Sequence, residues 1–466
     1  MIRMFSQYIS SKGVLYAVCE CMLVILALLC GGWVRFWTSP AEFENYLRMP
    51  DFGVQCLLFV VCVGVSFYYN DMYDLSILRG RRDRLLDLGQ ALGAAALLLG
   101  LAYFIFPDLT IGRGVWAISM ALIMVFVVVN RFAMDSVWRM TPRQNAMILG
   151  TGPLAMDVAR QMEERPDLNL HLCGFVDCGT GPGESGSILG YPLLGMADQL
   201  EALAGAQQIS RIVVALEDRR GSLPVRELVR LRVQGVYVDD AHTTIAALSG
   251  RVWLRTVRPS WFVFSGGFHR SKWTLFLKRT LDLTFALAGL VFCLPLMALV
   301  AVAIRLESKG PAIFRQERVG HRSRRFQVLK FRSMREDAEA GGARWATVDD
   351  PRVTRLGARL RKYRLDELPQ FWNVIRGDMS FIGPRPERPV FVEELCKHIS
   401  YYDERHSVRP GLSGWAQVQY PYGASIEDSF RKLEYDLFYV KNMSVLFDCL
   451  IVVKTVAIVL TGQGGR

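Results

Sequence analysis

The sequence is poor in the features that mark a disulfide scaffold or a freely soluble protein. Only 10 of its 466 residues are cysteine, and none of these form a Cys-x-x-Cys pair, which argues against a disulfide framework. Charged residues make up 21% of the chain against 51% hydrophobic residues, and the mean hydropathy is +0.21. These values exclude a disordered chain and favour a membrane protein. Six cysteines lie within apolar runs, where a thiol acts as a small hydrophobic group: Cys19, Cys21, Cys30, Cys56, Cys62 and Cys293. We therefore expect reduced thiols and cytoplasmic soluble parts.

Charge of one sign is in excess. The chain has 55 Lys and Arg against 44 Asp and Glu, a formal net charge of +11. Such an excess indicates an acidic partner: nucleic acid, anionic lipid or a phosphorylated substrate. The arginines of the C-terminal third are framed by Pro and Gly and interleaved with acids, unlike the continuous basic stripe that follows a nucleic-acid backbone. We therefore expect no nucleic-acid partner.

Four apolar segments come first, each close to the roughly 20 residues that cross a bilayer as a helix. They are Val14–Trp37, Phe52–Asn70, Leu88–Phe106 and Val115–Phe132. Arginines are concentrated in the loop 71–87 and after the fourth segment, so the positive-inside rule places both ends of the bundle in the cytoplasm. The first run has no small-residue cleavage site and is followed by similar runs, so we do not expect a cleaved signal peptide. Residues 1–140 are predicted to form a transmembrane bundle of four spans.

Residues 141–265 show the alternation of strand and helix that is typical of a parallel, Rossmann-like α/β domain. The turn Gly150-Thr-Gly152-Pro-Leu-Ala155 follows a strand, and Asp177 lies at a plausible distance for a ribose contact. Such a turn can hold a pyrophosphate at a helix N-terminus, but its glycines can also serve tight strand–helix packing alone. Both alternatives stay open. Strands are predicted at Asn145–Gly150, Leu170–Val176, Arg211–Leu216 and Gly235–Val238.

A fifth apolar segment, Leu281–Ile304, is long enough to span but contains Pro295 near its middle. Proline removes a backbone hydrogen bond and kinks a helix. A full crossing would place everything after Arg305 outside the cell, away from cytoplasmic substrates. We therefore predict a re-entrant helix over about residues 278–308 that enters and leaves by one leaflet, with an ordinary kinked span as the alternative. Leu446–Leu460 is interrupted by charges and is predicted to be an interfacial helix.

The C-terminal third contains an adjacent pair of acids among fixed cations. Asp366 and Glu367 precede an apolar helical face that Gly377 can end, and Arg361 and Arg364 lie beside them. A helix N-terminus and nearby arginines both lower a carboxyl pKa. We therefore expect Asp366 to be ionised and suited to bind a metal or attack phosphorus. An N-cap aspartate with surface ion pairs is the alternative for this pair taken alone.

Three cations support the phosphate interpretation. Arg385 lies in the rigid stretch Gly-Pro-Arg-Pro, Arg409 lies in Arg-Pro-Gly, and Lys330 follows a predicted strand at 326–329. An arginine fork matches phosphate oxygens, and a lysine supplies a point charge. The arrangement favours a diphosphate ligand.

Four motifs in order resemble the bacterial sugar transferases known as monotopic phosphoglycosyl transferases. They are Lys-Phe-Arg-Ser-Met at 330–334, Leu-Asp-Glu-Leu-Pro-Gln at 365–370, Arg-Gly-Asp-Met-Ser-Phe-x-Gly-Pro-Arg-Pro at 376–386 and Val-Arg-Pro-Gly-x-Ser-Gly-Trp-Ala-Gln-Val at 408–418. The resemblance covers about 278 to the end and implies a catalytic domain of α/β type over 266–466. The four spans and middle domain are similar to the long members, and the stretch 409–428 is most similar to members found with exosortase (PEP-CTERM) exopolysaccharide loci.

The resemblance implies an activity and a site. Such enzymes transfer a sugar-1-phosphate from a UDP-sugar to polyprenyl phosphate, which implies that Asp366 attacks the β-phosphate, that UMP leaves, and that Mg2+ binds at Asp366. Glu367 would handle a proton or support the metal. It also implies a homodimer in the bacterial inner membrane. The family often has Ser-Pro where this chain has Leu294-Pro295. The residues implied to lie near the phosphates are Lys330, Arg332, Arg361, Arg385, Arg409 and Asp436.

Two alternatives remain at this point. The same transfer can occur by direct displacement, with Asp366 acting only as a metal ligand. The chain can also be a non-catalytic, membrane-anchored regulatory protein. Neither the sugar nor a ligand of the middle domain follows from the sequence.

Overall fold

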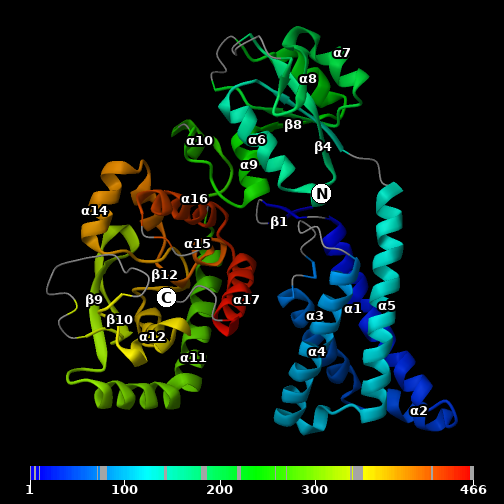
Figure 1. The fold of residues 1–466 in the computed structure, drawn as a ribbon, viewed down its shortest axis with the longest axis vertical. Coiled ribbons are helices and arrows are strands. Elements are labelled where there is room, and N and C mark those ends of the chain that lie inside the picture. The colour runs from blue at the N-terminus through cyan, green and yellow to red at the C-terminus, as the bar shows by residue number, and fades with distance from the viewer. Residues whose placement is uncertain are drawn as a thin grey trace. The chain divides into compact units, whose positions relative to one another are not determined.

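The computed structural model describes most of the chain: residues 2–4, 7–9, 11–70, 72–73, 81–140, 144–179, 186–217, 222–257, 259–268, 270–335, 338, 350–420, 423 and 425–461. Its contacts divide it into two compact units, Met1–Thr244 and Ile245–Arg466. Figure 1 shows the helical bundle and the α/β sheet of the first unit, and the mixed α/β fold of the second.

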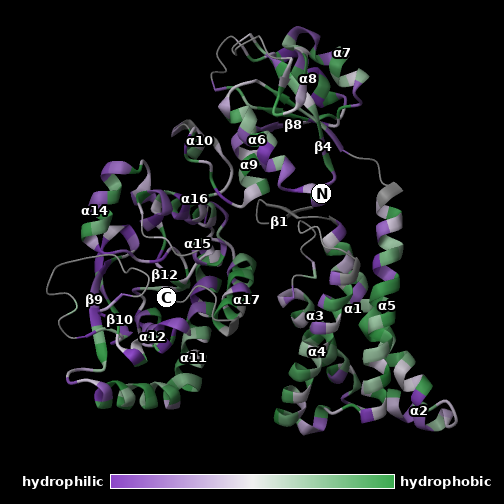
Figure 2. Cartoon of the chain, viewed as in Figure 1, coloured by the Kyte–Doolittle hydropathy of each residue, from purple (hydrophilic) through white to green (hydrophobic). Residues whose placement is uncertain are grey.

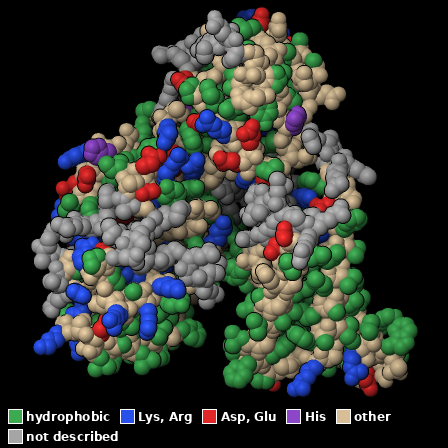
Figure 3. All heavy atoms as spheres, viewed as in Figure 1, with side chains coloured by type: hydrophobic (Ala, Val, Ile, Leu, Met, Phe, Trp, Pro, Cys, Tyr) green, Lys and Arg blue, Asp and Glu red, His purple; other side chains and the backbone are tan. Residues whose placement is uncertain are grey.

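The four N-terminal apolar segments are helices, as predicted. They are α1 (Ser11–Arg35), α3 (Phe52–Tyr69), α4 (Arg81–Ile105) and α5 (Arg113–Met140). Across the described residues, these four helices and α11 (Lys272–Glu307) are the five that are long and apolar enough to cross a membrane. Their apolar surfaces are visible in Figure 2, and hydrophobic side chains cover most of the bundle face seen in Figure 3. That the first four cross the bilayer stays a prediction.

The bundle has polar features that the sequence analysis missed. The Arg131 side chain on α5 donates a 2.7 Å hydrogen bond to Glu20 of α1, which is 1% exposed. Lys12 and Tyr16 of α1 both contact Asp135 of α5. Buried charges in a membrane bundle are costly unless paired, so these contacts hold α1 against α5. Three short elements were also missed: the hairpin β1 (Ile2–Met4) and β2 (Gln7–Ile9), helix α2 (Pro40–Leu47) and turn η1 (Pro107–Leu109).

The predicted parallel sheet of the first unit is confirmed. Its strand order is β5-β6-β4-β3-β7-β8, and every neighbouring pair is parallel except β5 with β6. The two strands that the sequence analysis missed come from a stretch containing Gly190 and Pro192, which obscure the strand pattern. The bounds are β3 (Gln144–Leu149), α6 (Pro153–Glu163), η2 (Pro166–Leu168), β4 (Leu170–Asp177), β5 (Ser187–Ile188), β6 (Tyr191–Met196), η3 (Ala197–Gln199), α7 (Leu200–Ala206), β7 (Arg211–Val214), α8 (Val225–Val233), β8 (Tyr237–Asp240) and α9 (Ala241–Ser249).

The glycine turn before α6 is used for close packing. Gly150 has φ +120°, and a Cβ there would lie 2.6 Å from the carbonyl oxygen of Ala215. Asp177 is 6% exposed and accepts a hydrogen bond from the Gly179 N–H at 3.1 Å. These contacts support the packing alternative for Gly150, and nucleotide binding by this domain stays a prediction.

Helix α11 is the longest element of the second unit, and Figure 1 shows it turning sharply between its two halves. Pro295 lies inside the helix. Ala286, in the first half, belongs to one buried apolar cluster, and Ile304, in the second half, belongs to another. Leu368 packs against both clusters. A straight helix of 36 residues would be about 54 Å long, so the bend is what lets both halves pack on one domain.

The rest of the second unit is a small mixed α/β fold around the bent helix. The chain just before α10 packs on α16, where the Val252 N–H donates to the carbonyl oxygen of Glu434. The bounds are α10 (Pro259–Phe264), β9 (Ile313–Val319), η4 (His321–Ser323), β10 (Arg325–Phe331), α12 (Arg355–Lys362), η5 (Leu365–Glu367), α13 (Gln370–Arg376), β11 (Ser380–Ile382), α14 (Pro389–His398), η6 (Tyr402–Ser407), β12 (Gly411–Ser413), α15 (Trp415–Gln419), α16 (Ile426–Asn442) and α17 (Val445–Thr461).

The C-terminal helix α17 is docked on this fold. Phe447 and Ile451 are fully buried, whereas Leu446 is 68% exposed. Asp448, one of the charges that interrupts its apolar run, is buried and bonds to Lys278 of α11 at 2.7 Å. The helix therefore has one buried face and an exposed apolar residue, and its location at the membrane interface stays a prediction.

Two of the sequence motifs, at 376–386 and 408–418, meet where strands β11 and β12 pair in parallel. The Gly383 N–H donates to the carbonyl oxygen of Ser413 at 2.8 Å, and the Gly411 N–H donates to that of Pro384 at 2.9 Å. A Cβ on Gly411 would lie 2.1 Å from the Gly383 nitrogen, and one on Gly414 would lie 2.1 Å from the Gly383 oxygen. The glycines thus allow two backbones to touch, and this contact fixes the loop that carries Arg385.

We predict that Gly411→Ala destabilises the second unit, because backbone atoms must move apart to admit the methyl group. Overpacking of this kind costs about 2 kcal/mol, or a fall in Tm of roughly 4–8 °C for a unit of this size, measured by scanning fluorimetry in detergent. Gly266→Ala is the control, since a Cβ there meets nothing within 4 Å. An equal Tm for both variants would contradict the close crossing.

Candidate active site

The two adjacent acids lie in the short turn η5, which links α12 to α13. Arg364 precedes the turn with φ +54°, and the left-handed residue redirects the chain inward. Asp366 is 8% exposed and Glu367 is 6% exposed. Helix α13 begins at Gln370, so Asp366 lies in the turn before the helix and not at its N-terminus, as the sequence analysis assumed. The helix ends at Gly377, as predicted, and its Trp372 is 53% exposed. Both carboxylates are therefore held inside the domain.

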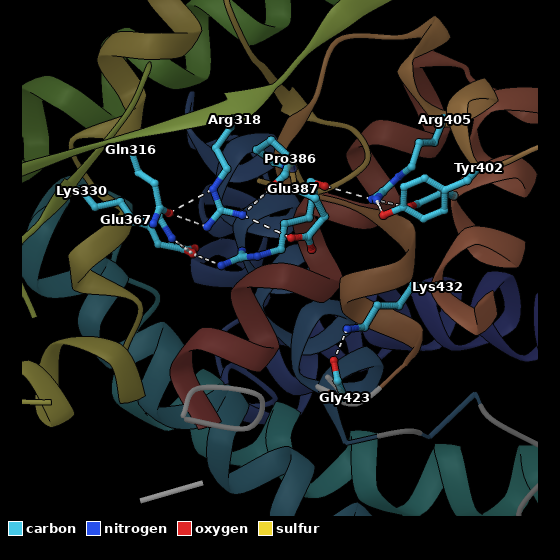
Figure 4. A network of polar contacts seen from close by, with 12 residues as sticks. Gln316, Arg318, Lys330, Glu367, Pro386, Glu387, Tyr402, Arg405, Gly423 and Lys432 are labelled. Carbon is cyan, nitrogen blue, oxygen red and sulfur yellow. Dashed lines mark hydrogen bonds and ion pairs between the residues drawn. The ribbon is translucent and has the colours of Figure 1, made fainter. Parts of the chain in front are cut away.

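Glu367 is the paired member of the two. Its Oε1 lies 2.7 Å from Nη2 of Arg385 and 3.7 Å from Nζ of Lys330, as Figure 4 shows for Lys330 and Glu367. Burial raises the pKa of this carboxyl, but Arg385, Lys330 and Arg364 outweigh burial and lower the pKa to about 2. A carboxylate with so low a pKa is a weak base, which argues against the expected proton-transfer role of Glu367 and favours an electrostatic one.

Asp366 is the unpaired member. Within the described ranges its carboxylate makes no hydrogen bond or ion pair. Burial, and then the charge of Glu367, raise its pKa to about 6, against the lowering effect of Lys330, Arg361 and Arg385. The expectation of a lowered pKa for Asp366 is therefore wrong, because burial and the neighbouring acid outweigh the cations. A more basic carboxylate is a better nucleophile.

Lys330 reaches the site from the end of β10. This strand pairs with β9 in antiparallel register, opposite Phe314. Asn373 of α13 holds the strand in place, because its Nδ2 donates to the Gln327 carbonyl oxygen at 2.8 Å and its Oδ1 accepts from the Leu329 N–H at 3.0 Å. Burial, and then the charge of Arg385, lower the pKa of Lys330 to about 8. The helix and the strand thus place Lys330 and Glu367 together.

A network of hydrogen bonds and ion pairs that the sequence analysis missed holds the backbone of Arg385. Arg405 is 6% exposed, contacts Asp436 at 2.7 Å and donates to the carbonyl oxygen of Arg385 at 2.9 Å. Arg318 donates to Gln316 and to Glu387, and Figure 4 shows these bonds. The sequence analysis missed Arg405 because its neighbours in the sequence do not reveal that its side chain is buried.

Two of the predicted substrate ligands have other partners. Arg332 is 8% exposed and donates to Lys309 at 2.6 Å and to Ser308 at 2.9 Å, so it closes the end of the bent helix α11. Asp436 is 1% exposed and is held by Arg405, and its burial argues against direct contact with a phosphate. In this structure both side chains support the fold, and a substrate contact stays a prediction for each of them.

The remaining predicted ligands differ in position. Arg361 donates to Ser333 Oγ at 2.9 Å, and its charge acts on Asp366. Arg409 is exposed, and its charge acts on Arg279 and His321. The structure therefore brings together Asp366, Glu367, Lys330, Arg361 and Arg385, and it places Arg409 beside a second set of cations.

The donor set fits a magnesium ion in only a minimal way. Among the described residues no group of three or more His, Cys, Asp or Glu side chains is suited to hold a metal. Glu367 is occupied by Arg385 and Lys330, so the free carboxylate is that of Asp366. Mg2+ is commonly held by one or two carboxylates together with waters and substrate phosphates, so a single free carboxylate is compatible with this ion.

Two parts of the chain match the models of known protein families. Residues 273–462 match the family model of bacterial sugar transferases, and residues 69–239 match a model described as a CoA-binding domain. The chain is 41% identical, over 186 residues, to the UDP-glucose:undecaprenyl-phosphate glucose-1-phosphate transferase of Caulobacter vibrioides, which covers 40% of this chain and 70% of that protein. The chain belongs to the bacterial sugar transferase family. This confirms the resemblance; the narrower subfamily stays a prediction.

Two further relatives match different shares of this chain. It is 50% identical over 191 residues to the UDP-N-acetylgalactosamine-undecaprenyl-phosphate N-acetylgalactosaminephosphotransferase of Aeromonas hydrophila, 41% of this chain and 45% of that protein. It is 29% identical over 462 residues to the undecaprenyl-phosphate glucose phosphotransferase of Komagataeibacter xylinus, 94% of this chain and 82% of that protein. The chain thus matches less than half of the first protein and most of the second.

We predict that Arg385→Ala destabilises the second unit of the sugar transferase, because it leaves the buried Glu367 carboxylate without its closest partner. Breaking a buried pair from one side costs on the order of 3 kcal/mol. The additional change Glu367→Gln should restore most of the lost Tm, since it removes the unpaired charge. Thermal unfolding of the single and double variants measures both effects.

Arg376→Ala is the matched control, because Arg376 is half exposed and pairs with Asp378 at the surface. Surface pairs contribute about 0–1 kcal/mol, so its Tm should stay close to that of the wild type. Equal losses in Arg385→Ala and Arg376→Ala would show that the Glu367 pair has no special weight.

Proposed function

We propose that this sugar transferase moves a sugar-1-phosphate from a UDP-sugar to undecaprenyl (polyprenyl) phosphate, releasing UMP, through a covalent phosphosugar on Asp366. This would be the first membrane step in the assembly of an exopolysaccharide or O-antigen. The family membership supports the transfer. The observation that supports the covalent route is the contrast between two adjacent carboxylates, of which Glu367 is paired and Asp366 is not.

The first step balances as a displacement at phosphorus. An Asp366 carboxylate oxygen forms a bond to the β-phosphorus, and the bond from this phosphorus to the bridging oxygen breaks, so that UMP leaves with that oxygen. Lys330 and Arg385 lie beside Asp366 and Glu367, which we call the dyad, and are available to neutralise phosphate charge. In the second step an oxygen of polyprenyl phosphate attacks the same phosphorus, and the Asp366 carboxylate is released.

Mg2+ is part of the proposal, with Asp366 as its protein ligand. When bound, the ion would neutralise charge on the diphosphate. The chain's own part is to keep Glu367 bonded to Arg385, so that the Asp366 carboxylate remains available.

The bend in α11 supports a re-entrant helix that enters and leaves the membrane by one leaflet, with the active site facing that leaflet. Both halves of α11 pack against the same domain through Leu368, which favours the re-entrant helix over a full crossing. Such a helix would lie in the cytoplasmic leaflet of the inner membrane, with the soluble parts in the cytoplasm. Its exposed apolar side chains include Leu287, Val291, Phe292, Leu299 and Leu306, a composition that suits contact with lipid.

The alternatives have less support. In direct displacement Asp366 would be only a metal ligand. That route gives no role to an unpaired carboxylate of raised pKa beside Lys330 and Arg385. A non-catalytic regulatory protein is at odds with the transferase names of the relatives. Those names carry different sugars, so the sugar is left open, and a homodimer stays a prediction.

We predict that purified wild-type protein with Mg2+ and a UDP-sugar, without lipid acceptor, releases UMP in a burst of about one equivalent per active site. A covalent intermediate gives such a burst because the first step does not need the acceptor. A panel of UDP-sugars identifies the substrate. Direct displacement predicts UMP only when polyprenyl phosphate is present.

Asp366→Asn should abolish the burst. Asp403→Asn, an exposed carboxylate of the same unit, is the control and should keep it. A normal burst from Asp366→Asn would exclude the covalent route.

We also predict that both ends of α11 lie in the cytoplasm. In a background with all 10 cysteines replaced, Lys272→Cys and Lys309→Cys should react with an impermeant maleimide only after bacterial spheroplasts are permeabilised. Arg48→Cys, in a loop predicted to face outward, should react in intact spheroplasts. Reaction of the residue at 309 in intact spheroplasts would show a full crossing.

A further inference from the structure

Gln370 opens helix α13 directly after the turn that carries the two carboxylates. Leu368 and Pro369, which lie between, have φ angles of −55° and −61°, so the backbone winds helically from Asp366 to Gln370. Residues three or four positions apart in such a winding lie on one side of it. Gln370 therefore leaves the helix on the side of Asp366 and Glu367.

The Gln370 side chain is buried with an unused donor. It is 4% exposed, and its Nε2 has no hydrogen-bond partner in the described part of the chain. A buried donor without an acceptor destabilises a fold, so such groups are rare unless a ligand or water completes them. Asn373 on the same helix differs, since its amide is fully buried and bonds to strand β10 at both ends. The Asn373 amide thus supports the fold, whereas the Gln370 amide keeps a donor without an acceptor on the side of Asp366 and Glu367.

The chemistry of the site limits which acceptor Gln370 can meet. Lys330 and Arg385 are the cations next to the dyad and offer no acceptor. Glu367 is already bonded to Arg385. The Asp366 carboxylate is an acceptor in the same winding, but the Gln370 amide makes no hydrogen bond to it. A phosphoryl group placed for attack by Asp366 brings non-bridging oxygens, which are strong acceptors. The ligand class that fits Gln370 is therefore the phosphoryl group of a diphosphate.

We infer that Nε2 of Gln370 donates a hydrogen bond to a non-bridging oxygen of the phosphoryl group that Asp366 attacks. This inference rests on the proposed function and adds a catalytic residue to it. Because the amide is neutral, it binds the phosphoryl oxygen without forming an ion pair with Asp366. Because it is held by the fold before substrate arrives, it stabilises developing charge with little reorganisation.

The test is Gln370→Met, which keeps a side chain of similar length and removes the donor. We expect kcat for UMP release to fall about 100-fold, the usual effect of losing one fixed donor to a developing charge. The KM for the UDP-sugar should change less than about threefold, since the bond is strongest in the transition state. The Tm should stay equal or rise, because the variant no longer buries an unpaired donor.

Two controls separate chemistry from folding. Gln161→Met makes the same replacement in α6, where the amide donates to Glu164 at 2.8 Å, and should leave kcat unchanged. Asn373→Leu removes the amide that supports the fold and should lower the Tm.

A wild-type kcat in Gln370→Met, a change in KM alone, or a fall in Tm together with kcat would each overturn the inference. Failure of the wild-type protein to release UMP from any UDP-sugar would instead overturn the proposed function, so the two failures are distinguishable.

Discussion

The buried ion pair between Glu367 and Arg385 is the constraint on which the catalytic unit depends. An ionised carboxylate is costly to bury unless it is paired and hydrogen-bonded, and Lys330 and Arg385 meet that need for Glu367. The pairing is unequal, because Asp366 in the same turn keeps a free carboxylate with a raised pKa. Two adjacent residues of the same chemical type thus have different roles: Glu367 holds the cations in place, and Asp366 is left available for reaction.

The bent helix α11 belongs to the same arrangement. Lys278 donates to the carbonyl oxygen of Ile382 at 2.9 Å, and Asp282 accepts from the Phe381 N–H at 2.9 Å. Both bonds fix strand β11, which leads directly to the loop that carries Arg385. The helix that we place in the membrane therefore also positions the partner of Glu367. Under the proposed function, this direct connection would bring a lipid acceptor and a water-soluble donor to one site without a separate docking element.

Much of this architecture could be predicted from the sequence, because some signals are local. Apolar run length located α1, α3, α4 and α5, and strand–helix alternation located the parallel sheet. Contacts between residues far apart in the sequence leave no such local pattern. Arg332 and Asp436 are charged residues in motif regions, and only their own burial and their partners, Ser308 and Arg405, show that they support the fold. The pKa of Asp366 was misjudged for the same reason: nearby arginines are visible in the sequence, but the burial that outweighs them is not.

The central claim is that Asp366, and not its neighbour, is the carboxylate that reacts. The most direct measurement is mass spectrometry of peptides from wild-type protein quenched after mixing with Mg2+ and a UDP-sugar that it uses. The account predicts a phosphosugar on the peptide that contains Asp366, localised by fragmentation to that residue, and its loss when polyprenyl phosphate is added before quenching. A phosphosugar on Glu367 or on another side chain, or continued turnover with no adduct at any time, would contradict it.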